Sequence, residues 1–383
     1  MKYAHFADLH LGSWSQKRMQ QYSMDTFDAA LNDCLKENVE FILFSGDIFN
    51  TAIPNLDVLK QVTRRLTNLK QKGVNVYVIP GSHDYSASGK TMIDILDITE
   101  VVTNVSKGHV EQGKLVLEPV QDKSGAWITG IPGRRGMLDR QYYEHLSHDN
   151  LQFNEHSIFM FHTALTELKP KHLDKMQTYG ASFLPKGMSY YAGGHVHHTT
   201  VKEVEGYGTM TYPGALFPNN FAEIEKYSCG GYFLVTDGVP VFKPVQVVAH
   251  THTDIDCTNL SPAQIMERLT TIGPGLQTVR LHGQMNGKVS ELALQKLHSE
   301  DQILFNTAKL SSTQFMPIQC EEREDVEHEL ICQHVDDSDF LNKQQQINVA
   351  KQLLVSLNTE KKDGEKSYTF QDRVIETVEQ QFN

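Results

Sequence analysis

The chain has 383 residues, of which 39% are apolar and 21% charged, and its formal net charge is −12. That length exceeds one typical domain, and this apolar share suffices for packed cores and argues against wholesale disorder. A protein that binds nucleic acid by neutralising phosphates is usually basic, so any such contact here must use a local patch or bound metal ions.

The sequence also lacks the marks of export, membrane insertion and disulfide bonding. The start, Met1–His5, leads into no apolar region of signal-peptide length, and no stretch approaches the roughly 18 apolar residues of a membrane span. The cysteines are odd in number, five, and none has the CxxC spacing of zinc or redox sites. We therefore expect a cytoplasmic protein with reduced thiols and no membrane association.

The first hundred residues predict alternating strands and helices. Short, apolar, β-rich runs predict strands over 3–7, 41–45 and 74–79. One helix is expected between the first two strands, with Ser23 as its N-cap and apolar residues at helical spacing over 27–35. A second is expected after Pro54, with Leu59, Val62 and Leu66 on one face. This order predicts a sheet covered by helices.

Beyond residue 100 the helical periodicity fades, and short strands bounded by Gly, Pro, Asn and Asp follow. We expect strands near 114–118, 127–131, 158–161, 190–193, 209–212, 231–236 and 241–248. Residues 1–250 are therefore predicted to form one α/β domain with two packed sheets flanked by helices.

A smaller α/β unit is predicted over 251–320. Ser261 followed by Pro262 is the cap and first-turn pattern of a helix. Helices are expected over 262–272 and 289–298, and strands over 277–282 and 302–308. Because this unit has no Asp/His pattern of its own, we expect it to shape access to a site elsewhere and not to perform chemistry.

The last segment, 321–383, begins with an acidic stretch that we interpret as a linker. Apolar residues then recur at helical spacing over 340–357 and again over 370–382. These two helices either pack on the parent domain or dock a partner, and the sequence favours neither.

Residues of metal-binding type follow five of the predicted strands. The set comprises Asp8, His10, Asp47, Ser82, His83, His162, His195 and His197. Ligands gather at the carboxyl ends of strands in α/β sheets, and His195 and His197, two residues apart in an extended segment, face the same way. Imidazole mixed with carboxylate suits Mn, Fe or Zn better than Mg or Ca. The pattern predicts a dinuclear metal site.

Each of these residues can be given a role in such a site. Two metals about 3.5–4 Å apart can share one carboxylate, and Asp47 suits that bridging position. Asp8, His10 and His197 would complete one metal, and Ser82, His162 and His195 the other. His83 is not needed as a ligand and could protonate a leaving oxygen, the alternative being a structural hydrogen bond.

These motifs resemble those of the calcineurin-like metallophosphoesterases. The matching stretches, in order, are Asp8-Leu9-His10, Gly46-Asp47, Gly81-Ser82-His83-Asp84, His162 and Gly194-His195-Val196-His197. Within that superfamily, three stretches resemble the SbcD/Mre-eleven nucleases of double-strand-break repair, namely Ala7–Gly12, Ser45–Asn50 and Tyr212–Ala215. The resemblance is strong over 1–215 and loose beyond about 250, where the small α/β unit and the tail match that family's capping domain and ATPase-docking segment in placement.

The resemblance implies a calcineurin-like fold and a manganese-dependent exonuclease or endonuclease that acts on DNA ends. It also implies a homodimer and a partner that is an SMC-like ATPase of the SbcC type. Two residues depart from the family pattern. Ser82 stands where the family has an asparagine ligand, and Asn50 where some members have a second catalytic histidine. A hydroxyl is shorter and a weaker donor than an amide carbonyl, so we expect the second metal to bind less tightly or through water.

Two other functions stay open. One is a phosphoesterase that acts on protein, cyclic nucleotides or small phosphates, although protein phosphatases of the superfamily place an Arg just after the bridging Asp, and Ile48–Ala52 contains none. The other is a DNA-binding scaffold with a weakened metal site, which Ser82 and the acidic net charge favour.

Overall fold

The computed structural model describes residues 1–86, 88–153, 156–170, 176–269, 275–294, 297, 303–312, 345–350, 353, 373 and 375. The first of two compact units is Met1–Met285 with Val289–Ser311, and the second is Asn286–Lys288 with Ser312–Asn383. In the second unit, 345–350 is helical and Ile347 is buried. The acidic linker and most of the two expected tail helices lie outside the described residues.

Within the described residues, no helix has both the length and the apolar character needed to cross a bilayer.

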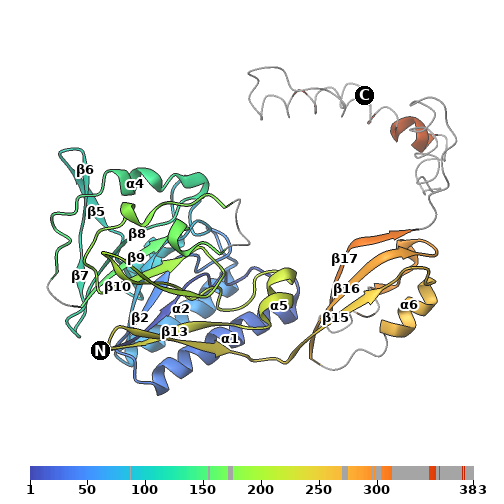
Figure 1. The fold of residues 1–383 in the computed structure, drawn as a ribbon, viewed down its shortest axis with the longest axis horizontal. Coiled ribbons are helices and arrows are strands. Elements are labelled where there is room, and N and C mark those ends of the chain that lie inside the picture. Colours follow the sequence, from blue (N-terminus) through green and yellow to red (C-terminus); the bar gives the residue numbers. More distant parts are fainter. Residues whose placement is uncertain are drawn as a thin grey trace. The chain divides into compact units, whose positions relative to one another are not determined.

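The first sheet of the first unit has the strand order β14-β13-β1-β2-β3-β4. Its strands β2 and β13 are labelled in Figure 1. Its strands β1 to β4 are parallel, and β13 and β14 pair antiparallel at one edge. The strands span Lys2–Phe6, Phe41–Ser45, Asn75–Ile79, Thr103–Asn104, Gly230–Thr236 and Val239–Val245. Three helices, α1 (Lys17–Lys36), α2 (Leu56–Gln71) and α3 (Met92–Ile98), contribute to the core on one face. The alternating strands and helices expected from the sequence are confirmed.

The first helix begins earlier than the sequence suggested. α1 starts at Lys17, and Ser23 is buried within the helix, so the expectation that Ser23 is the N-cap was wrong. The reason is tertiary packing, because Met19 and Tyr22 in the extra turns belong to a buried cluster with Ile224. Burial of those two side chains stabilises helical turns that have no side-chain cap.

The second sheet has the strand order β11-β12-β10-β9-β8-β7. Its four central strands β8, β9, β10 and β12 are parallel. In the order given for the sheet, the strands span Thr200–Val204, Gly208–Tyr212, Tyr190–Gly194, Ser157–His162, Trp127–Ile131 and Val120–Gln121. Tyr3 and Phe41 of the first sheet share one buried cluster with Ile158 and Tyr190 of the second. Two packed sheets were predicted, and this shared core confirms them.

The remaining elements are short. The strands β5 (Gly108–Glu111) and β6 (Lys114–Leu117) form a separate hairpin. The helix α4 (Arg140–Glu144) and the 3-10 turns η1 (Arg135–Met137), η2 (Thr166–Leu168) and η4 (Ala181–Phe183) lie in the connections of the second sheet. The apolar side chains on the outer face of the second sheet are covered mainly by these short turns and loops. This agrees with the loss of helical periodicity in the sequence after residue 100.

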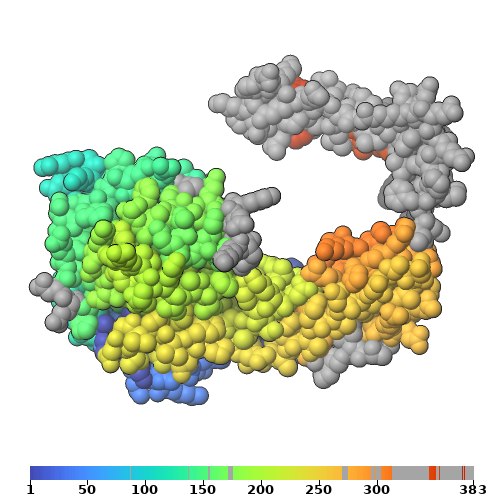
Figure 2. All heavy atoms as spheres, viewed as in Figure 1, coloured from blue at the N-terminus to red at the C-terminus, as the bar shows by residue number. Residues whose placement is uncertain are grey.

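The residues after the first two sheets form a small α/β module, here 250–312. Its sheet has the order β15-β16-β17, with strands His250–Asp256, Leu276–Met285 and Ile303–Ser312, and its helix is α6 (Pro262–Leu269). Figure 2 shows the described residues of this module in yellow to orange. Ser261 begins the helix as predicted, because its hydroxyl accepts the Gln264 N–H at 3.4 Å while the Gln264 side chain accepts the Ser261 N–H at 2.9 Å.

The helix expected over 289–298 does not form among the described residues. Val289–Glu291 is a single 3-10 turn, η5, and tight turns follow, in which Leu292 N–H donates to Val289 and Leu294 N–H to Leu292. The side chains of Val289, Leu292 and Leu294 all pack into the module's core. These residues are three and then two positions apart. Successive tight turns place all three on the same side, whereas the 3.6-residue period of an α-helix would not.

Candidate metal centre

The predicted site residues meet where the two sheets end. Asp8 and His10 follow β1, Asp47 follows β2, and Ser82 and His83 follow β3, all in the first sheet. The second sheet contributes His162 at the end of β9 and His195 and His197 after β10. In both sheets these strands are parallel, so their carboxyl ends lie side by side.

Two glycines allow this close approach. A side chain on Gly46, whose φ is +89°, would meet the His162 ring, and a side chain on Gly194 would meet the carbonyl oxygen of Ser45. In the space so left, His162 Nδ1 lies 2.8 Å from that same carbonyl oxygen. A carbonyl only accepts, so Nδ1 carries the proton and Nε2 faces the site.

Four of the site residues have left-handed backbone, with φ of 52° at Asp8, 42° at His10, 51° at Asp47 and 86° at His195. Such conformations are uncommon for residues other than glycine and persist where the surrounding structure fixes them. Here the Asp8 N–H donates to Gly46 O at 3.1 Å and the His10 N–H to Asp47 O at 2.9 Å. The loops after β1 and β2 are thereby tied together.

Asp47 is central to the cluster. Its Oδ2 lies 3.2 Å from His162 Nε2 and 3.6 Å from His10 Nε2. The Ser82 hydroxyl donates to the same oxygen at 3.4 Å. The other oxygen, Oδ1, accepts the main-chain N–H of His83 at 2.7 Å. One carboxylate is thus within reach of residues from both sheets.

Asp8 and His197 complete the cluster beside His10. His197 Nε2 lies 3.1 Å from His10 Nε2 and 3.8 Å from Asp8 Oδ1. Both oxygens of Asp8 also accept the His195 N–H, at 2.9 and 3.0 Å, which fixes the carboxylate.

The donor set fits divalent metal ions. Ligand atoms within 4.8 Å of one another form three groups, Asp8–His10–His197, Asp8–Asp47–His162 and His10–Asp47–His83. His10 Nδ1 and His162 Nε2 are buried and make no hydrogen bond to any described residue. His162 Nε2 is such an unbonded ring nitrogen and lies 3.2 Å from a carboxylate oxygen, and imidazole and carboxylate atoms that converge in this way suit a bound cation. The first group is the one expected for the first metal.

The second expected ligand set is only partly gathered. His162 is grouped with Asp8 and Asp47, while Ser82 and His195 belong to none of the groups of histidine and acidic ligands. The His195 ring is nevertheless 5.3 Å from the His162 ring, and the Ser82 hydroxyl faces Asp47. Ligation by Ser82 and His195 stays a prediction.

Burial and neighbouring charges set the protonation of the site. Burial lowers the pKa of His10 to about 3, so its ring is neutral near pH 7, as metal ligation requires. Burial would also lower the pKa of His162, but the Asp47 carboxylate outweighs it and raises that pKa to about 10. Despite its own burial, Asp47 has a pKa below its usual range because His162 and His10 face it. Asp47 is therefore ionised.

Two supporting carboxylates had no role predicted from the sequence. Glu223 of α5 (Phe221–Tyr227) lies 2.9 Å from His197 Nδ1. Asp84 accepts the N–H groups of Gly81, Ile48 and Phe49 at 2.8, 3.2 and 3.0 Å and so joins the loops after β2 and β3. Asp84 directly follows His83 and could have been suspected. Asn220 followed by Glu223 indicates only a helix start.

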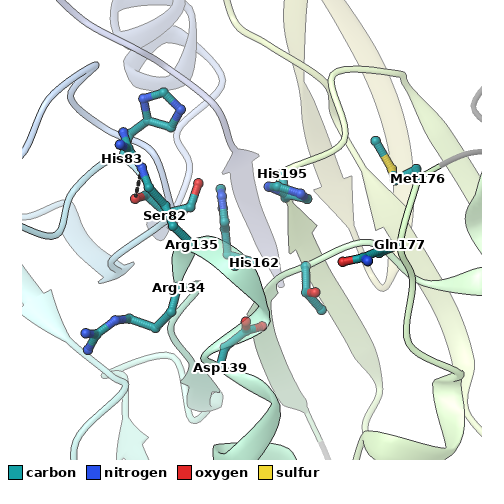
Figure 3. A pocket seen from close by; sticks show the side chains of 11 residues that line it. Ser82, His83, Arg134, Arg135, Asp139, His162, Met176, Gln177 and His195 are labelled. Atoms are coloured by element: carbon teal, nitrogen blue, oxygen red, sulfur yellow. Dashed lines mark hydrogen bonds between the residues drawn. The ribbon is translucent and has the colours of Figure 1, made fainter. Parts of the chain in front are cut away.

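A cavity of about 350 Å³ opens beside the cluster (Figure 3). Ser82, His162 and His195 line it on the metal side, and Arg135, Asp139 and Gln177 are among the residues that line the rest. Arg135 Nε donates to the Ser82 carbonyl at 3.1 Å. Arg134, which also lines the cavity, stacks over the Tyr85 ring at 4.3 Å. Two cationic side chains beside a candidate metal site suit an anionic phosphoester.

A family model described as calcineurin-like phosphoesterase matches residues 1–199. This range contains all the predicted metal ligands and His83. Among curated proteins, the chain is 24% identical over 244 residues to the DNA double-strand break repair protein Mre11 of Methanococcus maripaludis, covering 60% of this chain and 61% of that protein. It is 25% identical over 240 residues to the protein of the same name from Archaeoglobus fulgidus, covering 59% of this chain and 52% of that protein.

A third relative is the uncharacterized metallophosphoesterase YhaO of Bacillus subtilis, with 26% identity over 251 residues, 61% of this chain and 57% of that protein. The chain thus spans between 52% and 61% of the length of these three relatives. Two solved structures also match, a novel archaeal phosphodiesterase with 11% identity and a TM-score of 0.31, and a dimetal phosphatase from Danio rerio with 9% and 0.38. Both matches cover 64% of this chain and 99% of the other, and scores this low carry no weight for the site or the function.

Proposed function

The chain belongs to the calcineurin-like phosphoesterase family, and from this premise we propose that it is a metal-dependent nuclease that processes DNA ends in double-strand-break repair. The observation that carries the proposal is the position of Asp47, within 3.6 Å of ring nitrogens supplied by both sheets. Phosphoester hydrolysis follows from the family. The similarity to proteins named Mre11 supports DNA as the substrate.

The proposed cofactor is a pair of divalent ions, manganese first. Asp8, His10 and His197 would hold one ion, and Ser82, His162 and His195 the other, with Asp47 shared. Such ions, when bound, lower the pKa of a bound water towards roughly 7 and neutralise charge on a phosphoryl oxygen. Arg135, beside the cavity, would hold the phosphodiester against the cluster.

His83 is the proposed proton donor to the leaving oxygen. The main-chain N–H of His83 donates to Asp47. The ring Nδ1 lies 2.8 Å from the carbonyl oxygen of Asn50, so Nδ1 is the protonated donor of that bond. Nε2 is then the ring atom left to carry a second proton to substrate. The half-buried ring also lies near His10, with centroids 4.8 Å apart, and the same geometry admits His83 as a ligand.

The assembly is proposed as well. On α3, Ile95 and Ile98 are 53% and 76% exposed and three residues apart, so they share one face that suits a second copy of the chain. An SMC-like ATPase of the SbcC type is the proposed partner of the tail. We place the protein in the cytoplasm, which accords with the free thiols of Cys34, Cys229 and Cys257.

A paired digestion tests the proposed function. Zinc-free protein supplemented with manganese is given linear DNA and, separately, a chromogenic phosphodiester. Cleavage of both supports the nuclease. Cleavage of the small substrate alone favours another phosphoesterase, and DNA binding without cleavage of either favours the scaffold.

Replacement of Ser82 by asparagine should strengthen the second metal site. The Ser82 hydroxyl is directed at Asp47 Oδ2 at 3.4 Å, and an amide in its place would reach further into the cluster with a better donor oxygen. We expect two unequal manganese sites in the natural protein by calorimetry, closer affinities in Ser82→Asn, and a lower manganese requirement for activity. Two equally tight sites in the natural protein would show that Ser82 ligates well or that another side chain replaces it.

Truncation after Asp336 tests the tail. If the segment 340–382 docks an ATPase, the shortened chain should stay folded and keep its basal activity on a small phosphodiester. It should lose co-purification with a co-expressed SMC-like ATPase, which the full chain retains. A truncation that is insoluble would instead show that the tail packs on its parent domain.

A further inference from the structure

Three consecutive residues of α5 face three different parts of the first unit. Glu223 is bonded to His197, and Ile224 is fully buried. Glu225 is paired with Arg280 of β16. The helix thus lies between a proposed metal ligand and the α/β module. The proposed nuclease mechanism uses neither Glu225 nor Arg280.

On the metal side, Glu223 fixes the ring of His197. Its Oε1 lies 2.9 Å from His197 Nδ1, so Nδ1 donates to the carboxylate and Nε2 is directed at Asp8 and His10. Glu223 is itself held, because its Oε2 accepts the Asn219 N–H at 2.8 Å and its Oε1 the Asn220 side-chain N–H at 2.7 Å. A carboxylate on the distal nitrogen of a ligating histidine sets its tautomer and orientation.

On the module side, Glu225 accepts a forked pair of bonds from Arg280. Nε and Nη2 donate to its two oxygens at 3.1 and 2.5 Å. His252 of β15 approaches the same carboxylate, with Nε2 3.0 Å from Oε1, while its Nδ1 lies 3.0 Å from the buried Thr278 hydroxyl. Both side chains of the Arg280–Glu225 pair are less than a third exposed, which limits screening by solvent.

Between these bonds, Ile224 belongs to a buried cluster with Leu276 and Leu304 of the module. A cavity of about 170 Å³ lies beside the helix, lined by His197, Glu223 and Tyr227 among others. The helix is therefore held on the module side by an ion pair, and Ile224 packs against both the module and Met19 and Tyr22 of α1. The cavity borders the helix beside His197.

We propose that α5 couples the α/β module to the first metal site, with Glu223, Glu225 and Arg280 as positioning residues for His197. A module that is seated on α5 holds His197 in its ligating orientation, and a module that releases Glu225 loosens it. The inference rests on the proposed metal site but not on DNA as the substrate. It makes metal affinity responsive to whatever moves the module.

Manganese binding alone, measured by calorimetry, tests the coupling. Glu223→Ala should weaken one of the two sites by about 10–100-fold, and Glu223→Gln, which keeps an acceptor, by less. Arg280→Ala should weaken the same site by at least about 5-fold. The double variant should bind no more weakly than Glu223→Ala alone, because Arg280 acts through Glu223. The ¹⁵N shifts of the His197 ring should show Nδ1 protonated in the natural protein and a tautomer mixture in Glu223→Ala.

Arg65→Ala is the matched control. Arg65 makes a similar forked pair with Asp28 at 2.5 Å between α2 and α1, and its loss should leave both manganese affinities unchanged. Natural affinity in Arg280→Ala, or losses that add in the double variant, would overturn the coupling. If Arg280→Ala does not fold, Glu225→Gln takes its place under the same criteria. Failure to cleave DNA with manganese binding intact would count against the nuclease and not against this coupling.

Discussion

Asp47→Ala should remove nearly all bound metal and reduce hydrolysis to background. The carboxylate belongs to two of the three ligand groups and is the acceptor nearest to His162 Nε2. A single preorganised electrostatic contact is worth roughly 10²–10³ in turnover, so a group shared by both ions should cost at least about 10³-fold. Metal analysis of the purified variant and turnover of a chromogenic phosphodiester measure the two effects.

Asp122→Ala provides the control for this prediction. Asp122 is equally buried but lies elsewhere, where it accepts hydrogen bonds from Tyr77 at 2.7 Å and Asn75 at 3.0 Å. Its loss should lower stability and leave the metal content at two ions per chain. If Asp47→Ala also retained two ions per chain, the bridging role of Asp47 would be wrong.

His83→Ser should lose roughly 10²–10⁴-fold in DNA cleavage while it keeps metal content and DNA binding, the range expected of a general acid. The defect should be much smaller on a nitrophenyl phosphodiester, because nitrophenolate leaves without needing a proton. Comparison of the two substrates under the same manganese concentration therefore reports on proton transfer specifically.

The control is His145→Ser. That ring makes the same kind of bond, from Nδ1 to a main-chain carbonyl, with Gln141 at 2.9 Å, and it is exposed and not among the residues that line the cavity. Its loss should change neither substrate. Loss of metal in His83→Ser would make His83 a ligand, which its proximity to His10 and Asp47 would then explain.

The strands and the site could be predicted because one physical rule links them. Buried parallel strands are short apolar runs, and polar residues directly after them mark the carboxyl edge of a sheet, so Asp8, Asp47 and His162 were found from strand ends alone. The same rule failed where a strand is not apolar. β15 reads His250–Asp256 with alternating His, Thr and Asp, and was missed because much of it is not buried.

What could not be predicted depends on contacts distant in sequence. The early start of α1 depends on packing of Met19 against a cluster that contains Ile224, more than 200 positions away. The role of Glu223 depends on where α5 lies relative to His197, and its sequence context marks only a helix start. The left-handed backbone of Asp8 and His195 is likewise fixed by the neighbouring loops and not by residue type.

The proposed metal site draws its ligands from both sheets, and this has a consequence for the lifetime of the protein. An ion bound there would link the two sheets, and the binding site exists only in the folded state. Binding would therefore add about 2.7 kcal/mol to the free energy of unfolding when the free ion is at 100 times its dissociation constant. For a domain of 150–250 residues each 1 kcal/mol raises the melting temperature by about 2–4 °C. The melting temperature should then rise with the fraction of protein that has bound metal. If the site binds metal as proposed, in a cell short of the ion the unloaded chain would unfold more often and be exposed to proteases, and the supply of metal would then set the amount of the protein as well as its activity.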